Sequence, residues 1–288
     1  MKLANSFFRK ALGALSLLFF TVASVSSQVP AYLCELRNDV QVDSRTFEFD
    51  VYLLRTGATA FELSGIELGI NVNAGLRNGG AISVTIVNGS SELNAAQIPL
   101  DSQFSFDNAT NCIGMTASSL PGAGNGSVIS STGDGTRVGR IRITNSVTFG
   151  SVRPDLTWNF SSSNGLVTSV NAYVAGVSTD ITVQSSHTVS NLVNGVLVPP
   201  PAQFDVTGGG SYCSGGSGVA VGLSGSESGV TYTLIRDGAD LTPTVAGTGG
   251  VISFGNQTIA GTYTVRGTNV AGSTTMNGSA VVTVNTPP

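Results

Sequence analysis

The residues that could take part in catalysis are few and scattered along this chain. His187 is the only histidine, whereas a hydrolytic triad needs a histidine held by an acid beside a nucleophile. Serine and threonine surround His187, and no Gly-x-Ser-x-Gly nucleophile elbow occurs in the sequence. We therefore expect His187 to be an ordinary surface residue, and we predict no catalytic residue and no enzyme activity.

Paired carboxylates and paired arginines are the next candidates for chemistry. Glu48 and Asp50 share one side of an expected strand, about 7 Å apart, a separation that glycosidase carboxylates can have. Such enzymes also need a cleft and an acid of raised pKa, so a solvated strand face is the favoured interpretation. Arg140 and Arg142 also share a side, with Arg137 close by. This spacing favours a solvated face, or a ladder against neighbouring carboxylates, over an anion site.

Metal and cofactor sites have little support. One histidine and three scattered cysteines give no ligand pair at zinc spacing. Asp134, Asp237 and Asp240 could supply oxygens to calcium, but no Asp-x-Asp-x-Asp-Gly loop occurs, and turn chemistry explains all three. We predict no metal and no cofactor.

The cysteines and the single tryptophan leave two structural questions. Cys34 with Cys112 is the only disulfide that can form within residues 28–198, and two buried free thiols are the alternative. Cys213 has no partner in the remainder of the chain. Trp158 has the parity of its apolar neighbours, which predicts a core position, whereas a sugar-binding platform would need it exposed.

Charge and composition exclude several classes of function. Both lysines, Lys2 and Lys10, lie in the first ten residues, and the rest has 10 arginines against 17 acidic residues, a net charge of −7. Nucleic-acid binding needs clustered cations, so this negative charge argues against it. P-loop and Schiff-base mechanisms need a lysine, and no lysine follows Lys10, so both are excluded. Disorder goes with low hydrophobicity and high charge, but this chain is 41% hydrophobic and 10% charged.

The first 27 residues read as a signal peptide. A basic start is followed by an apolar stretch over residues 11–22 and by small residues up to Ser27. Twelve mostly apolar residues are too few to span a bilayer, and no later segment approaches the length needed. We expect an exported protein, extracellular or at the cell surface, with no membrane span.

Almost every later segment alternates apolar and polar residues with the period of a strand. Within residues 28–198 we predict strands at 46–53, 61–72, 81–87, 112–116, 137–144, 156–160 and 167–174. The alternation changes parity at Ser64-Gly65, which predicts a β-bulge. Asn-Gly or Asp-Gly occurs eight times, and both pairs suit tight hairpin turns. The sequence therefore predicts an all-β protein.

Three consecutive prolines, residues 199–201, divide the chain and favour a stiff polyproline spacer. Residues 28–198 are long enough for one β-sandwich, and residues 202–288 have the length of one immunoglobulin-like β-sandwich. In the second part we predict strands at 203–207, 218–223, 231–236, 251–254, 262–267 and 280–285. Tyr263 has the place of the tyrosine in a tyrosine corner, and Val265 lies where antibody domains carry a cysteine. The strand and prolines at residues 284–288 suggest another linker, with further repeats downstream.

Several runs of sequence resemble one family of bacterial proteins. They include Tyr32-Leu-Cys-Glu-Leu-Arg-Asn-Asp-Val40, Phe47-Glu-Phe-Asp-Val-Tyr-Leu-Leu-Arg-Thr-Gly57 and Gly135-Thr-Arg-Val-Gly-Arg-Ile-Arg142 in the first part, and Gly208-Gly-Gly-Ser-Tyr-Cys-Ser-Gly-Gly-Ser217 and Ala260-Gly-Thr-Tyr-Thr-Val265 in the second. The family comprises large surface and secreted proteins of the type IX secretion system. The resemblance implies a cohesin-like or carbohydrate-binding-module-like jelly-roll sandwich over residues 28–198, followed by an immunoglobulin-like repeat.

The resemblance implies a surface stalk or adhesin and transfers no catalytic residue. Related repeats carry a second cysteine that residues 268–276 lack, so the family disulfide is in doubt, and the C-terminal sorting domain is missing, as in a fragment. We expect a non-enzymatic structural or adhesive protein with surface glycans or other surface proteins as partners. The alternative is a carbohydrate-binding module that targets a polysaccharide-degrading enzyme.

Overall fold

The computed structural model describes residues 29–117 and 120–286, so the predicted signal peptide, residues 1–27, lies outside the described residues. Strands form nearly all of the regular structure, and in the described parts no helix is long and apolar enough to cross a membrane. The helical turns of the described residues are short 3-10 segments: η1 (Ala74–Arg77), η2 (Ala95–Gln97), η3 (Asp101–Gln103), η4 (Ser162–Asn164) and η5 (Gln184–Ser186).

Two sheets build the part of the structure that precedes the prolines. The first sheet has the order β12 (His187–Val189), β1 (Tyr32–Gln41), β2 (Thr46–Arg55), β8 (Thr136–Asn145) and β4 (Ile82–Ile86). The second sheet has the order β11 (Val177–Asp180), β10 (Ser169–Val174), β3 (Glu62–Asn71), β6 (Cys112–Met115) and β5 (Phe104–Asp107); β7 (Ser127–Val128) and β9 (Thr157–Trp158) also pair with β3.

Two further sheets follow the prolines. The smaller one has the order β13 (Val206–Gly208), β15 (Val219–Leu223) and β19 (Ile252–Gln257). The larger one has the order β14 (Gly210–Cys213), β22 (Ala280–Asn285), β20 (Gly261–Asn269), β16 (Thr231–Arg236) and β17 (Ala239–Asp240); β18 (Val245–Ala246) pairs with β16 and β21 (Gly272–Thr275) pairs with β20. The predicted fold class, all-β with two sandwiches in tandem, is therefore correct.

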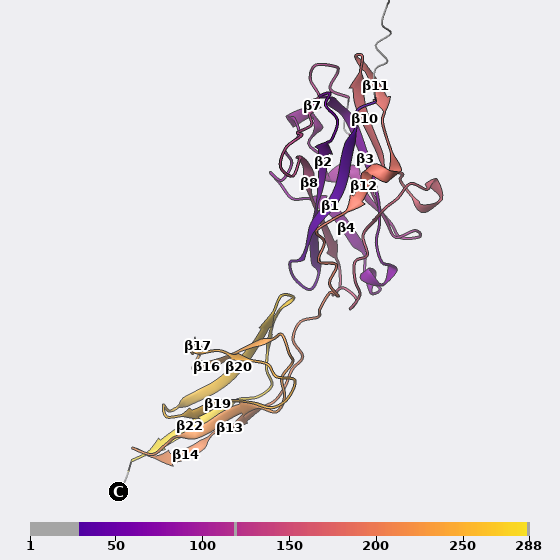
Figure 1. Cartoon of the computed structure of the whole chain (residues 1–288). Helices are drawn as coiled ribbons and strands as arrows, with labels where there is room; N and C mark the ends of the chain where they lie inside the picture. Colours follow the sequence, from indigo (N-terminus) through magenta and orange to yellow (C-terminus); the bar gives the residue numbers. More distant parts are fainter. Residues whose placement is uncertain (1–28, 118–119, 287–288) are drawn as a thin grey trace, which may run out of the picture.

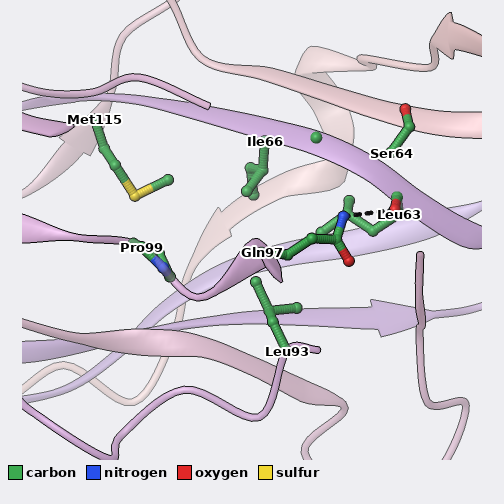
Figure 2. Close-up of a pocket in the computed structure, with 8 residues that line it drawn as sticks. Leu63, Ser64, Ile66, Leu93, Gln97, Pro99 and Met115 are labelled. Carbon is green, nitrogen blue, oxygen red and sulfur yellow. Dashed lines mark hydrogen bonds between the residues drawn. The ribbon is translucent and has the colours of Figure 1, made fainter. Parts of the chain in front are cut away.

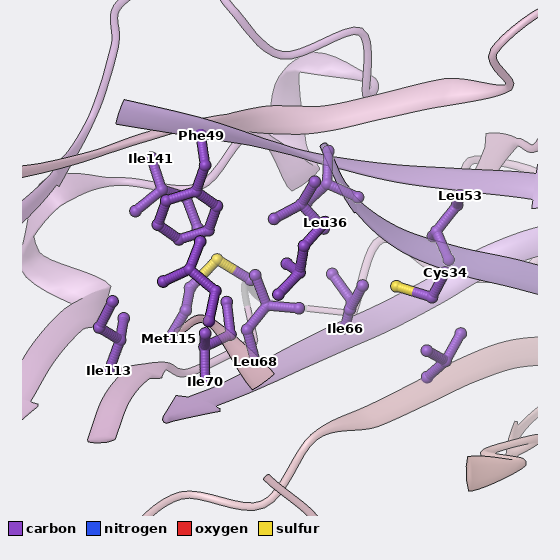
Figure 3. Close-up of a cluster of buried hydrophobic side chains, with 14 of the residues drawn as sticks. Cys34, Leu36, Phe49, Leu53, Ile66, Leu68, Ile70, Ile113, Met115 and Ile141 are labelled. Carbon is purple, nitrogen blue, oxygen red and sulfur yellow. The ribbon is translucent and has the colours of Figure 1, made fainter. Parts of the chain in front are cut away.

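The alternation of apolar and polar residues along the strands explains which side chains form the core of the first sandwich. The apolar residues of β2, namely Phe47, Phe49, Val51 and Leu53, are each at most 1% exposed. They pack against apolar residues of β3 and β6 in the opposite sheet, and Figure 3 shows this cluster with the Cys34 thiol at one side of it. Burying a side chain of this size stabilises the fold by about 1.5–3 kcal/mol.

The β-bulge predicted in β3 is present. Gly65 pairs with Asn171 of β10, and Leu63 pairs with the next residue, Ala172, so Ser64 is the extra residue on β3. An extra residue reverses which side chains face the core. Leu63 is therefore buried on one side of the bulge, and Ile66 and Leu68 are buried on the other.

The second sandwich has its own core and the predicted tyrosine corner. Its buried apolar cluster runs from Val221 to Val282 and shares no residue with the first cluster. Tyr263 at the start of β20 is fully buried, and its hydroxyl donates to the carbonyl of Ile259 at 2.7 Å. Val265 is also fully buried, in the place where antibody domains carry a cysteine.

The two sandwiches lie end to end (Figure 1). Strands β1 to β12 form the upper part of the picture and strands β13 to β22 the lower part. The labels of β7, β10 and β11 mark the upper end of the first sandwich, which points away from the second. We call this upper end the distal end.

Candidate functional site

Acidic residues of β2 face arginines of β8 on the side of the first sheet that points away from the core. Glu48 pairs in register with Arg142, and Asp50 pairs with Arg140. Arg140 donates from Nε to Asp50 Oδ1 at 2.8 Å and from Nη2 to Oδ2 at 3.1 Å, and Arg142 Nε donates to Glu48 Oε1 at 2.7 Å. The prediction of a ladder between these arginines and neighbouring carboxylates is confirmed.

The same carboxylates are more buried than expected. Glu48 is 6% exposed and Asp50 is 2% exposed, so the prediction of a solvated strand face is wrong for both. The long arginine side chains cover them, and Asn38 also donates to Asp50, at 3.0 Å. The hydrogen bond from Arg140 to Asp50 raises the pKa of the arginine above its ordinary value. Both carboxylates are therefore held by protein donors.

His187 is buried, and the expectation of a surface position is wrong. Strand β12 pairs in parallel with β1, which sets His187 opposite Cys34 and leaves the histidine 9% exposed. The rings of Tyr32, Trp158 and Phe160 meet the imidazole edge to face, with centroids 5.7, 5.1 and 4.9 Å away. Alternation could not reveal this position, because β12 is only three residues long.

The imidazole of His187 is held by a carbonyl and not by an acid. Nδ1 lies 2.9 Å from the carbonyl of Val183, so the neutral ring donates there and Nε2 is left as an acceptor. Nε2 is buried without a hydrogen-bond partner. Burial lowers the pKa of His187, and the bond to Val183 opposes that change only in part. Burial therefore favours the neutral form of the imidazole.

Cys34 and Cys112 are both buried free thiols in the structure, which is the alternative to the disulfide that the sequence left open. Cys34 lies in the first sheet, opposite Leu53 and His187. Cys112 lies in the second sheet, where its sulfur contacts the side-chain amide of Asn159 at 3.7 Å. Each thiol has different neighbours, and burial raises the pKa of both. Cys213 is exposed.

The aspartates considered for calcium are held by the protein itself. Asp134 accepts from Arg37 at 2.7 Å, and Asp240 pairs with Arg266. Asp237 has a φ of 52° in the turn between β16 and β17, and it accepts from the backbone N–H of Thr262 at 2.9 Å. The described residues contain no group of three or more side chains suited to a metal ion.

Trp158 packs at the edge of the first core. Its side chain is half-buried against the apolar cluster, and its indole N–H donates to the carbonyl of Thr188 at 2.8 Å. The aromatic side chains of the described residues are all buried or half-buried. A flat, exposed platform on which a sugar ring could stack is therefore not found in this part of the chain.

A small cavity lies next to the bulge in β3 (Figure 2). Gln97 lines it together with apolar side chains such as Ile66 and Met115, and its amide donates to the carbonyl of Leu63 at 2.8 Å. The Gln97 carbonyl oxygen accepts from both the backbone N–H and the hydroxyl of Ser127. The volume is about 10 Å³, enough for one water molecule and too small for a ligand.

A larger groove opens at the distal end of the first sandwich, and we call it the distal groove. Its volume is about 300 Å³, which is in the range of small-ligand pockets. Residues from three parts of the chain line it: Ala60, Phe61 and Glu62 at the start of β3, Ala123, Gly124 and Val128 around β7, and Tyr173 and Gly176 at the β10–β11 hairpin. None of these residues has a type and spacing in the sequence that would indicate a site.

Two polar side chains fix the wall of the distal groove. The Glu62 carboxylate accepts a hydrogen bond from the backbone N–H of Gly124 at 2.7 Å. The Tyr173 hydroxyl oxygen accepts one from the backbone N–H of Gly122 at 2.8 Å. They tie the Gly122–Gly124 loop to β3 and β10, so the groove is preformed. Val128 is 63% exposed at its rim, and Val177, next to the lining residue Gly176, is 65% exposed.

Comparison with known proteins finds similarity in fold only. No protein-family model matches the chain, and no curated protein sequence matches it. Similar solved structures include the second type II cohesin module from the adaptor ScaA scaffoldin of Acetivibrio cellulolyticus, with 10% identity over 55% of this chain and 86% of that chain and a TM-score of 0.33. Murine CEACAM1b has 12% identity over 88% of this chain and 100% of that chain, with a TM-score of 0.34. A titin I-band fragment, I67–I69, has 11% identity over 89% of this chain and 66% of that chain, with a TM-score of 0.28.

Proposed function

We propose that this chain is a non-enzymatic structural and adhesive protein of the cell exterior, with a binding head on a stalk. Residues 28–198 would be the head, residues 199–201 the spacer, and residues 202–288 the stalk domain. The separation of the two apolar clusters supports these boundaries, since the first ends at Leu197 and the second begins beyond the prolines. Export through residues 1–27 is part of the proposal.

The position of the distal groove carries the adhesive part of this proposal. The groove lies at the end of the head that points away from the stalk (Figure 1), where a partner on another surface can reach it. Loops and hairpin turns line it, and such segments commonly hold binding sites on a rigid scaffold. Exposed Val128 and Val177 add apolar surface beside it.

The state of the polar residues supports a non-enzymatic role. The Glu48 and Asp50 carboxylates are paired with arginines, and the ring of His187 is enclosed by aromatic side chains. A general acid or base must be able to reach the substrate proton that it moves. Within the described residues, these groups serve the packing of the sandwich.

Binding of the mature chain to immobilised probes tests this function. The protein, coupled to biotin at the exposed Cys213, would be applied to a glycan array and to surfaces coated with fibrinogen, fibronectin or collagen. We expect selective, saturable binding that leaves the probe chemically unchanged. Cleavage of a probe would overturn the non-enzymatic assignment. Glycan binding that Trp158→Ala abolishes, with the fold intact, would instead favour a carbohydrate-binding module.

A further inference from the structure

The spacer, residues 199–201, and the residue on each side of it are held at three points. Gln41 at the end of β1 makes two hydrogen bonds to Val198: its amide donates to the carbonyl at 2.9 Å, and its oxygen accepts from the backbone N–H at 3.0 Å. Asn269 at the end of β20 donates to the carbonyl of Pro199 at 2.9 Å. Glu227 accepts from the backbone N–H of Ala202, also at 2.9 Å. Side chains from both sandwiches therefore hold a spacer whose prolines have no N–H to donate.

The sandwiches also contact each other directly. The turn between β20 and β21 reaches the loop between β1 and β2, where the backbone N–H of Ser44 donates to the carbonyl of Ala271 at 3.0 Å. Ala271 is only 3% exposed, although it lies in a turn. The side chain of Asn269 accepts from the N–H of Ala271 at 2.9 Å and so fixes the shape of this turn.

Val270 of the same turn faces an apolar hollow of the first sandwich. It lines a space of about 230 Å³ together with Val40, Val193 and Val196 of the first sandwich. A second space, of about 380 Å³, lies between the spacer and the residues Glu227–Val230. Because both spaces are open, apolar packing between the sandwiches is incomplete, and the hydrogen bonds across the contact add to it.

We infer that the stalk end of the first sandwich is an interaction surface whose partner is the chain's own second sandwich. The turn Asn269–Gly272 is the docking element, and Gln41, Asn269 and Glu227 hold the spacer against it. Domains joined by a short linker are expected to move relative to each other unless the contact restrains them. A proline spacer alone would keep the domains apart but would leave rotation about it free. The joint defined by these residues fixes both the separation of the two sandwiches and their rotation about the spacer. This conclusion does not depend on the proposed binding function.

A distance measurement between spin labels on the two sandwiches tests this joint. One label goes on the exposed Cys213 of the second sandwich, and the other on a cysteine introduced as Val177→Cys at the distal end. The buried Cys34 and Cys112 are not expected to react in the folded protein. Pulsed electron double resonance then gives the distribution of distances.

The joint variant combines Gln41→Ala and Asn269→Ala, and the matched control combines Asn256→Ala and Gln257→Ala in β19, away from the joint. We expect one narrow distribution for the parent and the control, and a broader, shifted one for the joint variant. A third variant carries a Gly/Ser segment inserted after Pro201 and gives the width of a free joint. A parent distribution as broad as that of the Gly/Ser variant would overturn the inference, and so would a folded joint variant that matches the parent.

Discussion

His187 shows how a single residue can acquire a role in stability that its sequence context hides. Its imidazole lies among Tyr32, Trp158 and Phe160, and Nε2 is buried without a partner. A charged imidazolium would lose its hydration in this place, which is why burial lowers the pKa of His187. We therefore expect protonation of His187, the only histidine of the chain, to destabilise the first sandwich.

We expect the free energy of unfolding to fall as the pH drops below the ordinary histidine pKa of about 6.5. The pKa of His187 is lower in the folded protein than in the unfolded chain, so the unfolded chain binds the proton first as the pH falls. The contribution of the neutral ring to stability is complete above the unfolded pKa. It then declines until the pH has fallen below the folded pKa. Urea denaturation at pH 7.5 and 5.5 measures this loss. His187→Phe keeps a buried ring but cannot titrate, so its stability should change much less over this range. An unchanged pH dependence in the variant would contradict this role.

The cysteines give a second prediction at this scale. In the native protein we expect only Cys213 to react quickly with a thiol reagent, because Cys34 and Cys112 are buried and their pKa values are raised. After denaturation without reductant, all three thiols should react. A count of one thiol under those conditions would mean that Cys34 and Cys112 form a disulfide in the protein.

At the scale of elements, the pairing of β2 with β8 organises the outer face of the first sheet. Glu48 and Asp50 alternate with the core residues of β2, and the register places each opposite an arginine. Asp50 has three protein donors from Arg140 and Asn38, so removing its charge leaves a covered guanidinium without its main partner. The ladder is therefore part of what fixes the register.

We predict that Asp50→Ala lowers the free energy of unfolding by about 3 kcal/mol, the usual cost of breaking a buried ion pair. Combining it with Arg140→Met should recover part of the loss, because the unpaired charge is then gone. Asp240→Ala, which breaks the more exposed pair with Arg266, should cost no more than about 1 kcal/mol. Urea denaturation of the four proteins measures this. Equal losses for Asp50→Ala and Asp240→Ala would contradict the assigned role.

The elements that sequence alone predicts well are those with a long alternating pattern. Strands β2, β3, β8, β16 and β22 lie within a residue or two of the predicted ranges, and the bulge at Ser64 follows from the change of parity. Strands β7 and β12 have two and three residues and exist because β3 or β1 supplies partners from far along the chain. Such strands have no pattern of their own, and the place of His187 depends on one of them.

Candidate sites were predictable only in part. The facing carboxylates and arginines follow from the parity of two strands, whereas their burial depends on long side chains that only the folded sheet brings together. The distal groove could not be predicted, because its walls come from three separated parts of the chain. Glu62 and Tyr173 have no unusual spacing in the sequence, and each matters because it holds the loop Gly122–Gly124.

For the whole molecule, the three prolines lie between Leu197, the last residue of the first apolar cluster, and Val221, the first of the second, which supports the proposed boundary. They did not indicate the joint, since Gln41 lies 157 residues before its partner Val198, and Asn269 lies 70 residues after Pro199. The distal groove and the joint occupy opposite ends of the first sandwich (Figure 1). An oriented head on a restrained stalk is the arrangement that these features support.

The most direct test of the proposed adhesive role compares binding of distal-groove variants by surface plasmon resonance. The mature chain, coupled through Cys213, would be tested against every glycan and protein probe of the screen. We predict that Val128→Ser with Val177→Ser weakens binding at least about tenfold, equivalent to 1.4 kcal/mol. The matched control, Ile259→Ser with Val281→Ser, changes exposed aliphatic residues of the second sandwich and should bind like the parent. Binding to no probe, or equal binding by both folded variants, would contradict the distal groove as the adhesive site.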